Sequence, residues 1–228
     1  HGCTAITCIT AQNSLEVTCV EAVQANTLKN QIDTLFTDFP IQSLKTGMLL
    51  NENIIINTAK KLKEYSVFKV IDPVMVSRTG SKLIEDNAIN AYKKLLFPQA
   101  EIVTPNIFEA NLLSNIQIRN ENDIEKSAQT ILRLGPKAVL IKGGGLSHLK
   151  GKDFYIDKTG KRNWLTHKFV NTSNTHGSGC TLSAAISSYL ALGFNLIESI
   201  KNAKLFIERS LDKSYKIGSG PGPLGHYQ

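Results

Sequence analysis

Short extended apolar runs alternate with helical patterns along most of this chain, and this alternation constrains the fold more than any other feature. The extended runs are residues 3–10, 41–46, 67–72, 101–104 and 138–142. Between them, apolar residues recur every three or four positions, which is the spacing of one helix face. Strand–helix–strand alternation is typical of βαβ units with right-handed crossovers. The sequence therefore predicts an α/β fold, with a central, mostly parallel sheet and helices on both faces.

Helix and hairpin signals fill the rest of the chain. Gly135 ends the third predicted helix, and Asn195 with Glu198 has capping-box spacing at the start of the last. Residues 153–156 and 162–166 flank a turn, which predicts an antiparallel hairpin at one edge of the sheet. The helices are expected at residues 54–65, 86–97, 122–134, 179–192 and 196–213.

Composition fits one globular domain over residues 1–228, with 42% apolar and 20% charged residues. Every apolar run is shorter than the ~20 residues that span a bilayer, and no secretory leader opens the chain. The cysteines Cys3, Cys8, Cys19 and Cys180 form no Cys-x-x-Cys pair. We therefore expect no structural zinc site, no disulfide framework and a reducing, cytoplasmic setting.

The net charge of +7 is carried by scattered lysines such as Lys60, Lys61, Lys93 and Lys94. Such lysines are expected on water-facing helix surfaces; the alternative is a weak steering of anionic substrates toward the protein. Nucleic-acid binding would require a basic stripe with interleaved aromatic residues, and the sequence has none. We expect no nucleic-acid or membrane partner.

Polar and glycine-rich clusters follow four of the predicted strands. They are residues 45–48, residues 72–75, residues 104–106 with Glu109, and residues 142–145. In an open parallel sheet the carboxyl ends of the strands share one edge, and ligands bind along that edge. One cluster alone would be weak support, but four together predict a ligand site.

The strongest single motif is residues 174–181, NTHGSGCT, which leads directly into an apolar helix. Glycines on either side of Ser178 let successive N–H groups point the same way, and the helix dipole adds positive potential. This arrangement favours a phosphate and the charge that develops in phosphoryl transfer. Cys180 lies in the first helical turn, where a thiol pKa falls, so it is a candidate base. The alternative is a tight turn followed by a small buried cysteine.

These motifs resemble the ribokinase superfamily, in which the corresponding turn commonly ends in Gly-Ala-Gly-Asp or Gly-Thr-Gly-Asp. Cysteine in place of that aspartate, preceded by NTHG, resembles the hydroxymethylpyrimidine/phosphomethylpyrimidine kinases in particular. Further matching segments are 10–13 (TAQN), 45–48 (KTGM), 72–76 (DPVMV), 104–106 (TPN) with Glu109, and the ending at 217–220 (IGSG). The resemblance implies a ribokinase-like fold and a requirement for ATP and Mg²⁺.

The resemblance also implies roles for individual residues at the phosphate end. Cys180 is expected to be the catalytic base for the hydroxymethyl group. Asn106 and Lys142 are expected to face the ATP phosphates. The anion hole is expected to consist of Gly177, Ser178 and Gly179.

At the substrate end, the resemblance implies that Gln12 hydrogen-bonds the pyrimidine and that Met48 and Val74 pack near its ring. Asp72 and Glu109 are expected to hold Mg²⁺, partly through water. Simpler interpretations exist: Asp72 as a cap at a strand end, Glu109 as an exposed residue of a short helix, and Gln12 and Met48 as residues without a ligand.

The chain departs from the family pattern in three ways. Gly145 stands where relatives usually carry His, which removes one polar contact, and Ser178 replaces the usual Thr. The resemblance also implies that the family's opening βα unit of roughly thirty residues, with its glycine-rich turn and aspartate, is missing here.

The resulting hypothesis is an ATP-dependent kinase that phosphorylates 4-amino-5-hydroxymethyl-2-methylpyrimidine and then its monophosphate, in thiamine biosynthesis. Apart from Cys180, such a protein mainly positions groups and neutralises charge. A pyridoxal or pyridoxine kinase of the same fold is the first alternative, and a non-catalytic ligand-binding homologue is the second. The resemblance further implies a homodimer.

Overall fold

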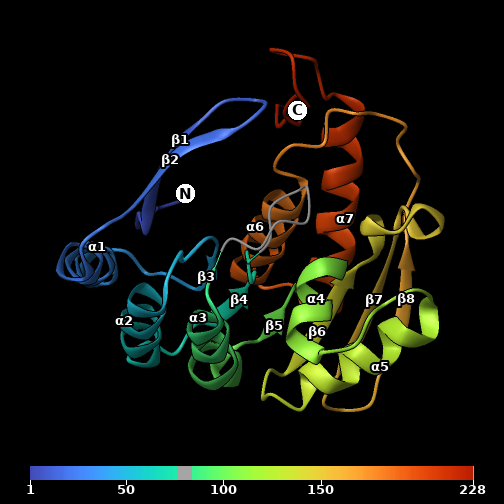
Figure 1. Ribbon diagram of the computed structural model, residues 1–228. Helices are drawn as coiled ribbons and strands as arrows, with labels where there is room; N and C mark the ends of the chain where they lie inside the picture. Colours follow the sequence, from blue (N-terminus) through green and yellow to red (C-terminus); the bar gives the residue numbers. More distant parts are fainter. Residues whose placement is uncertain (76–83, 228) are drawn as a thin grey trace.

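The computed structural model describes residues 1–75 and 84–227 and contains one central six-stranded sheet (Figure 1). Its spatial order is β3-β4-β5-β6-β7-β8; β3 to β6 pair in parallel, and β7 and β8 continue the sheet antiparallel. The mostly parallel sheet expected from the sequence is confirmed. The strands are β3 Ser43–Thr46, β4 Phe68–Ile71, β5 Ile102–Val103, β6 Ala138–Lys142, β7 Lys152–Asp157 and β8 Arg162–Thr166.

Helices cover both faces of this sheet (Figure 1). Because successive strand residues point to opposite faces, Val70 and Leu140 join the apolar cluster of α6 and α7. Their neighbours Ile71 and Ile141 join the cluster of α1 to α5 on the other face. The helices are α1 Ala25–Asp38, α2 Glu52–Lys63, α3 Asp86–Ala91, α4 Ile107–Ser114, α5 Glu121–Leu132, α6 Ser178–Ala191 and α7 Leu196–Asp212.

Asparagine side chains fix where four of these helices begin. At the start of α2, α4, α5 and α7, an Asn side-chain oxygen accepts a hydrogen bond from the backbone N–H three residues later; the caps are Asn51, Asn106, Asn120 and Asn195. Such a cap satisfies a helix donor that has no acceptor within the helix. The predicted capping box of Asn195 and Glu198 is confirmed, and Asn106 forms a second one with Glu109.

The first forty residues differ most from the sequence-based expectation. The predicted strand at residues 3–10 is instead β1 Cys8–Gln12, which pairs antiparallel with β2 Val17–Ala22 in a separate hairpin. That second strand and the following helix α1 were not predicted. Most hairpin residues are exposed, so the apolar alternation that marks a half-buried strand is weak here.

Smaller outcomes concern one helix, one motif residue, the edge hairpin and helix length. The helix predicted at residues 86–97 is α3, followed by a π-helical turn, Tyr92–Leu96, and a 3-10 turn, Phe97–Gln99. Val76, the last residue of the DPVMV segment, lies outside the described residues. The predicted edge hairpin is confirmed as β7–β8. No helix in the described part of the chain combines the length and apolar character that a membrane crossing requires.

A buried ion pair joins α7 to the sheet. The Lys204 ammonium group contacts the Asp153 carboxylate, and the two residues are 4% and 6% exposed. The second oxygen of Asp153 accepts a hydrogen bond from the Gly143 N–H at 3.0 Å. Asp153 therefore ties the turn after β6 to both β7 and α7.

Replacing Lys204 by Met should lower the free energy of unfolding by about 3 kcal/mol or more, because the Asp153 charge would remain buried without its partner. Lys201→Met, on an exposed position of the same helix, is the matched control and should change stability by about 0.5 kcal/mol or less. Chemical denaturation of the full-length variants measures both values. Equal effects of the two substitutions would contradict a stabilising role for the pair.

Candidate active site

Asp72, directly after β4, is the centre of the polar cluster at the carboxyl edge of the sheet. One carboxylate oxygen accepts hydrogen bonds from the Lys142 ammonium group at 3.0 Å and from the Thr104 hydroxyl at 3.2 Å. The other oxygen accepts from the Ser183 hydroxyl at 2.9 Å. Asp72 is only 1% exposed, so these three donors replace water around its charge. Segments from β4, β5, β6 and α6 therefore meet at one carboxylate.

Lys142 ends β6 and brings a positive charge to this cluster. Its backbone N–H donates to the Pro105 carbonyl at 2.9 Å, and it forms an isolated bridge with Asn106. Burial alone would lower the pKa of Lys142, but the charges of Asp72 and Glu109 outweigh that effect and raise it. Lys142 is therefore cationic at neutral pH and lies beside Asn106. That these two residues face the ATP phosphates stays a prediction.

Glu109, in the first turn of α4, is buried at 2% exposure, so its interpretation as an exposed helix residue is wrong. Its carboxylate accepts hydrogen bonds from the backbone N–H groups of Asn106, at 2.8 Å, and Met75, at 3.4 Å. Burial raises the pKa of Glu109 to about 7; Lys142 opposes the rise and the charge of Asp72 adds to it. A mixed protonation state follows near neutral pH.

Direct coordination of Mg²⁺ by Asp72 and Glu109 does not fit this geometry. Both oxygens of Asp72 already accept hydrogen bonds, and both carboxylates are almost fully buried. Mg²⁺ prefers octahedral oxygen coordination and keeps several waters, which needs space around the ligands. Within residues 1–75 and 84–227, no cluster of three or more His, Cys, Asp and Glu side chains could hold a metal ion.

The turn expected to be the anion hole stands at the start of α6. Gly177 is its N-cap and adopts φ +83°, a left-handed conformation that a side chain disfavours. The N–H of Thr181 bonds to the Gly177 carbonyl at 2.8 Å and closes the first turn. The N–H of Ser178, one of the residues expected in the anion hole, donates to the Thr175 carbonyl at 3.2 Å. A helix leaves its first N–H groups without intrahelical acceptors, so those of Gly179, also expected there, and of Cys180 can serve an anion. A Cβ built on Gly179 would lie 3.3 Å from the Lys142 ammonium nitrogen, which places this turn against the Asp72 cluster.

The pKa of the Cys180 thiol differs from the expectation. Its side chain reaches solvent, but the protein atoms around it displace water, and this desolvation raises the pKa of the thiol. The charge of Asp72 raises the pKa further, while Lys45 and Lys142 lower it. The prediction of a lowered thiol pKa is therefore wrong for the ligand-free protein, because desolvation and the charge of Asp72 outweigh the effect of the two lysines.

Ser183 is a site residue that the sequence-based argument missed. It is completely buried, and its hydroxyl lies 2.9 Å from Asp72 and 3.0 Å from the Cys180 carbonyl oxygen. It therefore fastens the first turn of α6 to the end of β4. The available signal was a serine three residues after Cys180, directly after the buried Leu182 in α6.

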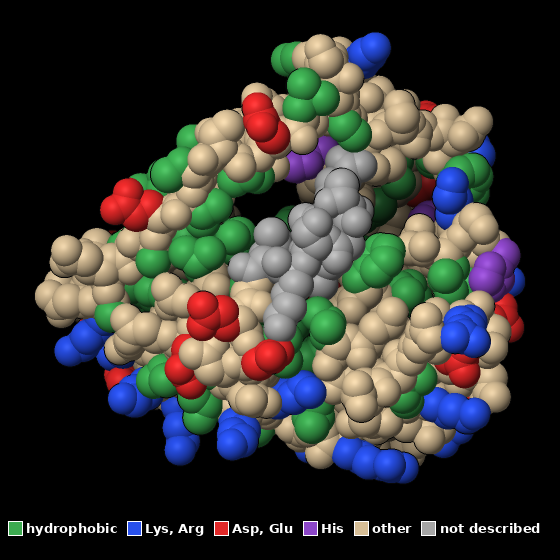
Figure 2. Space-filling view, in the orientation of Figure 1, with side chains coloured by type: hydrophobic (Ala, Val, Ile, Leu, Met, Phe, Trp, Pro, Cys, Tyr) green, Lys and Arg blue, Asp and Glu red, His purple; other side chains and the backbone are tan. Residues whose placement is uncertain are grey.

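The three residues expected at the substrate end lie on three separate segments of the chain. Met48 follows β3, Val74 lies two residues after Asp72 at the end of β4, and both are partly buried. Gln12 ends β1 and is exposed on the hairpin. The Thr7 hydroxyl donates to the Met48 carbonyl at 2.6 Å and joins the hairpin base to the Met48 loop. In the space-filling view an opening separates the hairpin from the body of the molecule (Figure 2).

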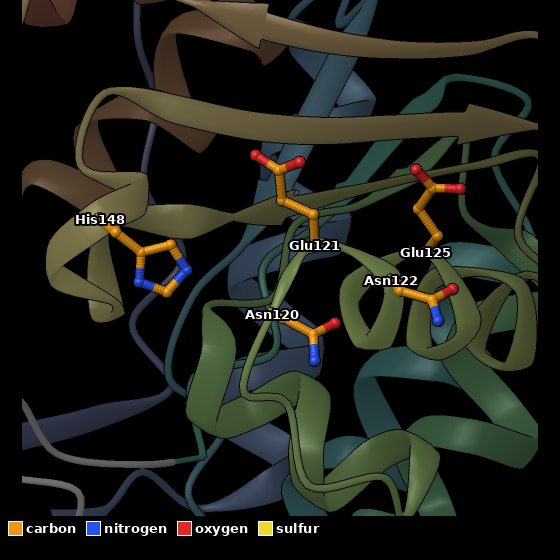
Figure 3. Close-up of a pocket in the computed structure, with 5 residues that line it drawn as sticks. All are labelled: Asn120, Glu121, Asn122, Glu125 and His148. Carbon is orange, nitrogen blue, oxygen red and sulfur yellow. The ribbon is translucent and has the colours of Figure 1, made fainter.

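A separate surface hollow contains none of the residues that the sequence predicts for the active site. It lies between the start of α5 and the short turn that carries His148 (Figure 3). Its lining is polar and acidic, with Asn120, Glu121, Asn122, Glu125 and His148. One of its carboxylates, Glu125, accepts a hydrogen bond from the Trp164 ring N–H at 3.3 Å. A phosphate would be repelled by this lining, so the hollow does not compete with the Asp72 cluster as a nucleotide site.

Comparison with known proteins supports the resemblance seen in the motifs. The profile of the phosphomethylpyrimidine kinase family matches residues 1–225. The hydroxymethylpyrimidine/phosphomethylpyrimidine kinase of Synechococcus elongatus is 43% identical over 228 residues, which cover 100% of this chain and 86% of that protein.

Solved structures agree on the ribokinase-like fold. The phosphomethylpyrimidine kinase of Clostridium difficile superposes with a TM-score of 0.80 at 37% identity, over 91% of this chain and 85% of that one. An ADP complex of Bacillus subtilis pyridoxal kinase superposes with a TM-score of 0.88 at 33% identity, over 97% and 84% of the two chains. The full-length family match, together with the motifs that meet at Asp72, shows that this chain belongs to the phosphomethylpyrimidine kinase family.

Proposed function

We propose that this chain transfers the γ-phosphoryl group of ATP to the hydroxymethyl group of 4-amino-5-hydroxymethyl-2-methylpyrimidine, and then phosphorylates the monophosphate to the diphosphate. The family match supports the reaction class. The observation that carries the proposal is the meeting of Lys142, Asp72 and the Cys180 turn at one edge of the sheet. That edge is where open α/β sheets bind ligands.

In the first transfer, the Cys180 side chain acts on the substrate hydroxyl, and backbone N–H groups of the same turn act on the phosphoryl group. The substrate hydroxyl oxygen forms a bond to the γ-phosphorus, and its proton moves to the Cys180 sulfur in its thiolate form. The bond from phosphorus to the bridging oxygen breaks, and its electron pair leaves with ADP. Negative charge on the transferring group is stabilised by the N–H groups of Gly179 and Cys180 in the first turn of α6 and by the Lys142 ammonium group. Asn106 lies beside Lys142 and is proposed to contact the nucleotide.

The second transfer uses the same site with a phosphate oxygen as the acceptor. Backbone donors do not distinguish an alcohol oxygen from a phosphate oxygen, so one turn can serve both steps. Mg²⁺ remains part of the proposal as the counter-ion of the ATP phosphates, which it neutralises. The buried state of Asp72 and Glu109 favours an ion held by the nucleotide and water rather than by these two carboxylates.

A vitamin B6 kinase is the second candidate, because the B. subtilis pyridoxal kinase superposes with a higher TM-score than the C. difficile pyrimidine kinase. The fold therefore does not select the substrate, and the 43% identity to a pyrimidine kinase favours the first candidate. A non-catalytic homologue remains the third hypothesis; the complete Cys180 turn argues against it. We also propose a cytoplasmic homodimer, which light scattering and cell fractionation of the full-length protein would test.

The full-length protein should turn over hydroxymethylpyrimidine with a kcat/KM at least about tenfold above that for pyridoxal, because the ring contacts select between two small aromatic alcohols. Coupled detection of ADP with each substrate measures this ratio. A preference of about tenfold for pyridoxal would replace the proposed substrate. Binding of ATP and pyrimidine without ADP release would support the non-catalytic homologue.

Cys180→Ala should lower turnover by about 10²-fold or more, because the proton acceptor is removed. ATP binding should be nearly unchanged, because the donors in the α6 turn belong to the backbone. Steady-state kinetics and calorimetric titration with ATP measure the two effects. The matched control is Cys19→Ala, an exposed cysteine on the hairpin. Near-normal turnover in Cys180→Ala would remove this residue from the mechanism.

The raised pKa of Cys180 predicts that turnover rises with pH, because only the thiolate accepts the proton. Between about pH 7 and about pH 9, kcat should increase by close to tenfold per pH unit. Kinetics in overlapping buffers measure the profile, and the residual activity of Cys180→Ala should lack the rise. A flat profile for the unmodified protein would show that thiol ionisation does not limit the reaction.

A further inference from the structure

The chain after α7 carries a run of glycines that the proposed reaction does not use. We call residues 218–225 the glycine tail; it contains Gly218, Gly220, Gly222 and Gly225. Glycine lowers the stability of a segment unless the backbone needs its small size or its conformational freedom. At each of these four positions a Cβ atom would overlap a neighbouring residue.

One end of the glycine tail is fixed to the body of the protein. The Leu224 side chain is 3% exposed and packs in the apolar cluster of α6 and α7. The Gly225 N–H donates to the Ser210 carbonyl at 3.0 Å, near the end of α7. These contacts hold residues 224 and 225 in place independently of the hairpin.

The middle of the glycine tail contacts the residues just before the α6 turn. The Gly222 N–H donates to the Asn174 side-chain oxygen at 3.0 Å. In return, the His176 N–H donates to the Gly222 carbonyl at 3.1 Å. His176 directly precedes Gly177, so the tail supports the segment that leads into the anion-hole turn.

The other end of the glycine tail contacts the tip of the β1–β2 hairpin. The Gly220 N–H donates to the Ser14 hydroxyl oxygen at 3.1 Å, and a Cβ on Gly220 would overlap the Ser14 carbonyl oxygen. Gly218 adopts φ +70°, and a Cβ there would lie 2.7 Å from the Ser14 hydroxyl oxygen. Two backbones therefore meet at a distance that only glycine allows. Figure 1 shows the hairpin tip next to the red C-terminal segment.

The hairpin depends on contacts at its two ends. Its base is fixed by the bond from Thr7 to the Met48 carbonyl and by two bonds between Ile6 and the Gln31 side chain. Most residues of its two strands are exposed. A two-stranded hairpin is marginally stable by itself in water, so the contact at Ser14 limits how far the tip moves. Gln12 lies two residues before Ser14 and moves with it.

We propose that Ser14, Gly218 and Gly220 are positioning residues for the pyrimidine. Through the glycine tail they hold the Gln12 end of the hairpin at a fixed place relative to the α6 turn. The inference rests on the proposed function, in which Gln12 contacts the pyrimidine and the α6 turn contacts the phosphoryl group. Loss of the contact weakens pyrimidine binding while the nucleotide contacts of Lys142 remain.

The test uses Gly220→Ala and Ser14→Ala in the full-length protein. For Gly220→Ala, KM for hydroxymethylpyrimidine should rise by about threefold to tenfold, with a smaller rise for Ser14→Ala. KM for ATP should stay within about twofold of its original value in both variants. Hydrogen–deuterium exchange of residues 8–22 should become faster, because the hairpin tip is released.

Thr18→Ala is the matched control for Ser14→Ala. It removes a hydroxyl from the same hairpin, where the Thr18 hydroxyl donates to the Ala11 carbonyl of the opposite strand. Gly2→Ala is the control for Gly220→Ala, since a Cβ there meets no atom within 4 Å. Both controls should leave KM for the pyrimidine unchanged. Equal rises in Thr18→Ala and Ser14→Ala would overturn the proposal, because general loosening of the hairpin would explain them.

The outcomes separate this proposal from the proposed function. If the unmodified protein does not phosphorylate the pyrimidine, the proposed function fails, and the exchange experiment still tests the contact itself. Faster exchange with an unchanged pyrimidine KM would overturn the positioning role. Unchanged exchange and unchanged KM in both variants would overturn the contact as well. If Gly220→Ala does not fold, Ser14→Ala decides, because it keeps the backbone geometry of the tail.

Discussion

The buried carboxylate of Asp72 is the constraint on which the active site depends. A charge at 1% exposure is tolerated only where donors replace water, and Asp72 has three of them, on Lys142, Thr104 and Ser183. Each donor comes from a different element, so satisfying one charge fixes the relative positions of β5, β6 and α6. The need to compensate the Asp72 charge therefore defines the geometry of the site, as a bound metal ion does in other proteins.

The same cluster sets the electrostatics around Lys142, Glu109 and Cys180. Asp72 and Glu109 share the single positive charge of Lys142, and burial already favours the protonated form of Glu109. In the proposed reaction, a triphosphate bound beside Lys142 would compete for its ammonium group and add negative charge near both carboxylates. That charge would favour the protonated form of Glu109 and disfavour the Cys180 thiolate. A cation that accompanies ATP would offset both effects, which gives a reason for charge neutralisation that does not require these carboxylates as ligands.

The sequence predicts the parts of the structure that follow from local rules. The strand 138–142 was expected with the bounds that the structure has, because four apolar residues and Lys142 lead into a glycine turn. The capping box of Asn195 and Glu198 was likewise predicted from its spacing in the sequence. The hairpin β1–β2 was not, because its exposed strands lack a buried face. The raised pKa of Cys180 was also not predictable from the sequence. The sequence shows the helix terminus, but the burial of the thiol and the neighbouring carboxylate of Asp72 are seen only in the structure.

We expect substrate choice in this fold to depend on segments outside the sheet edge and the start of α6. The phosphate end is built from sheet edges and a helix start, and a pyridoxal kinase superposes on this chain as well as a pyrimidine kinase does. A rigid phosphate end treats every acceptor alcohol alike, because its donors reach only the transferring group. In the proposed function, discrimination between ring systems comes from the hairpin with Gln12 and from the loop with Met48, which Thr7 joins. Under that proposal, changes at the hairpin tip or at Ser14 alter how the ring is held, whereas changes at Gly222 also reach the segment that leads into the α6 turn.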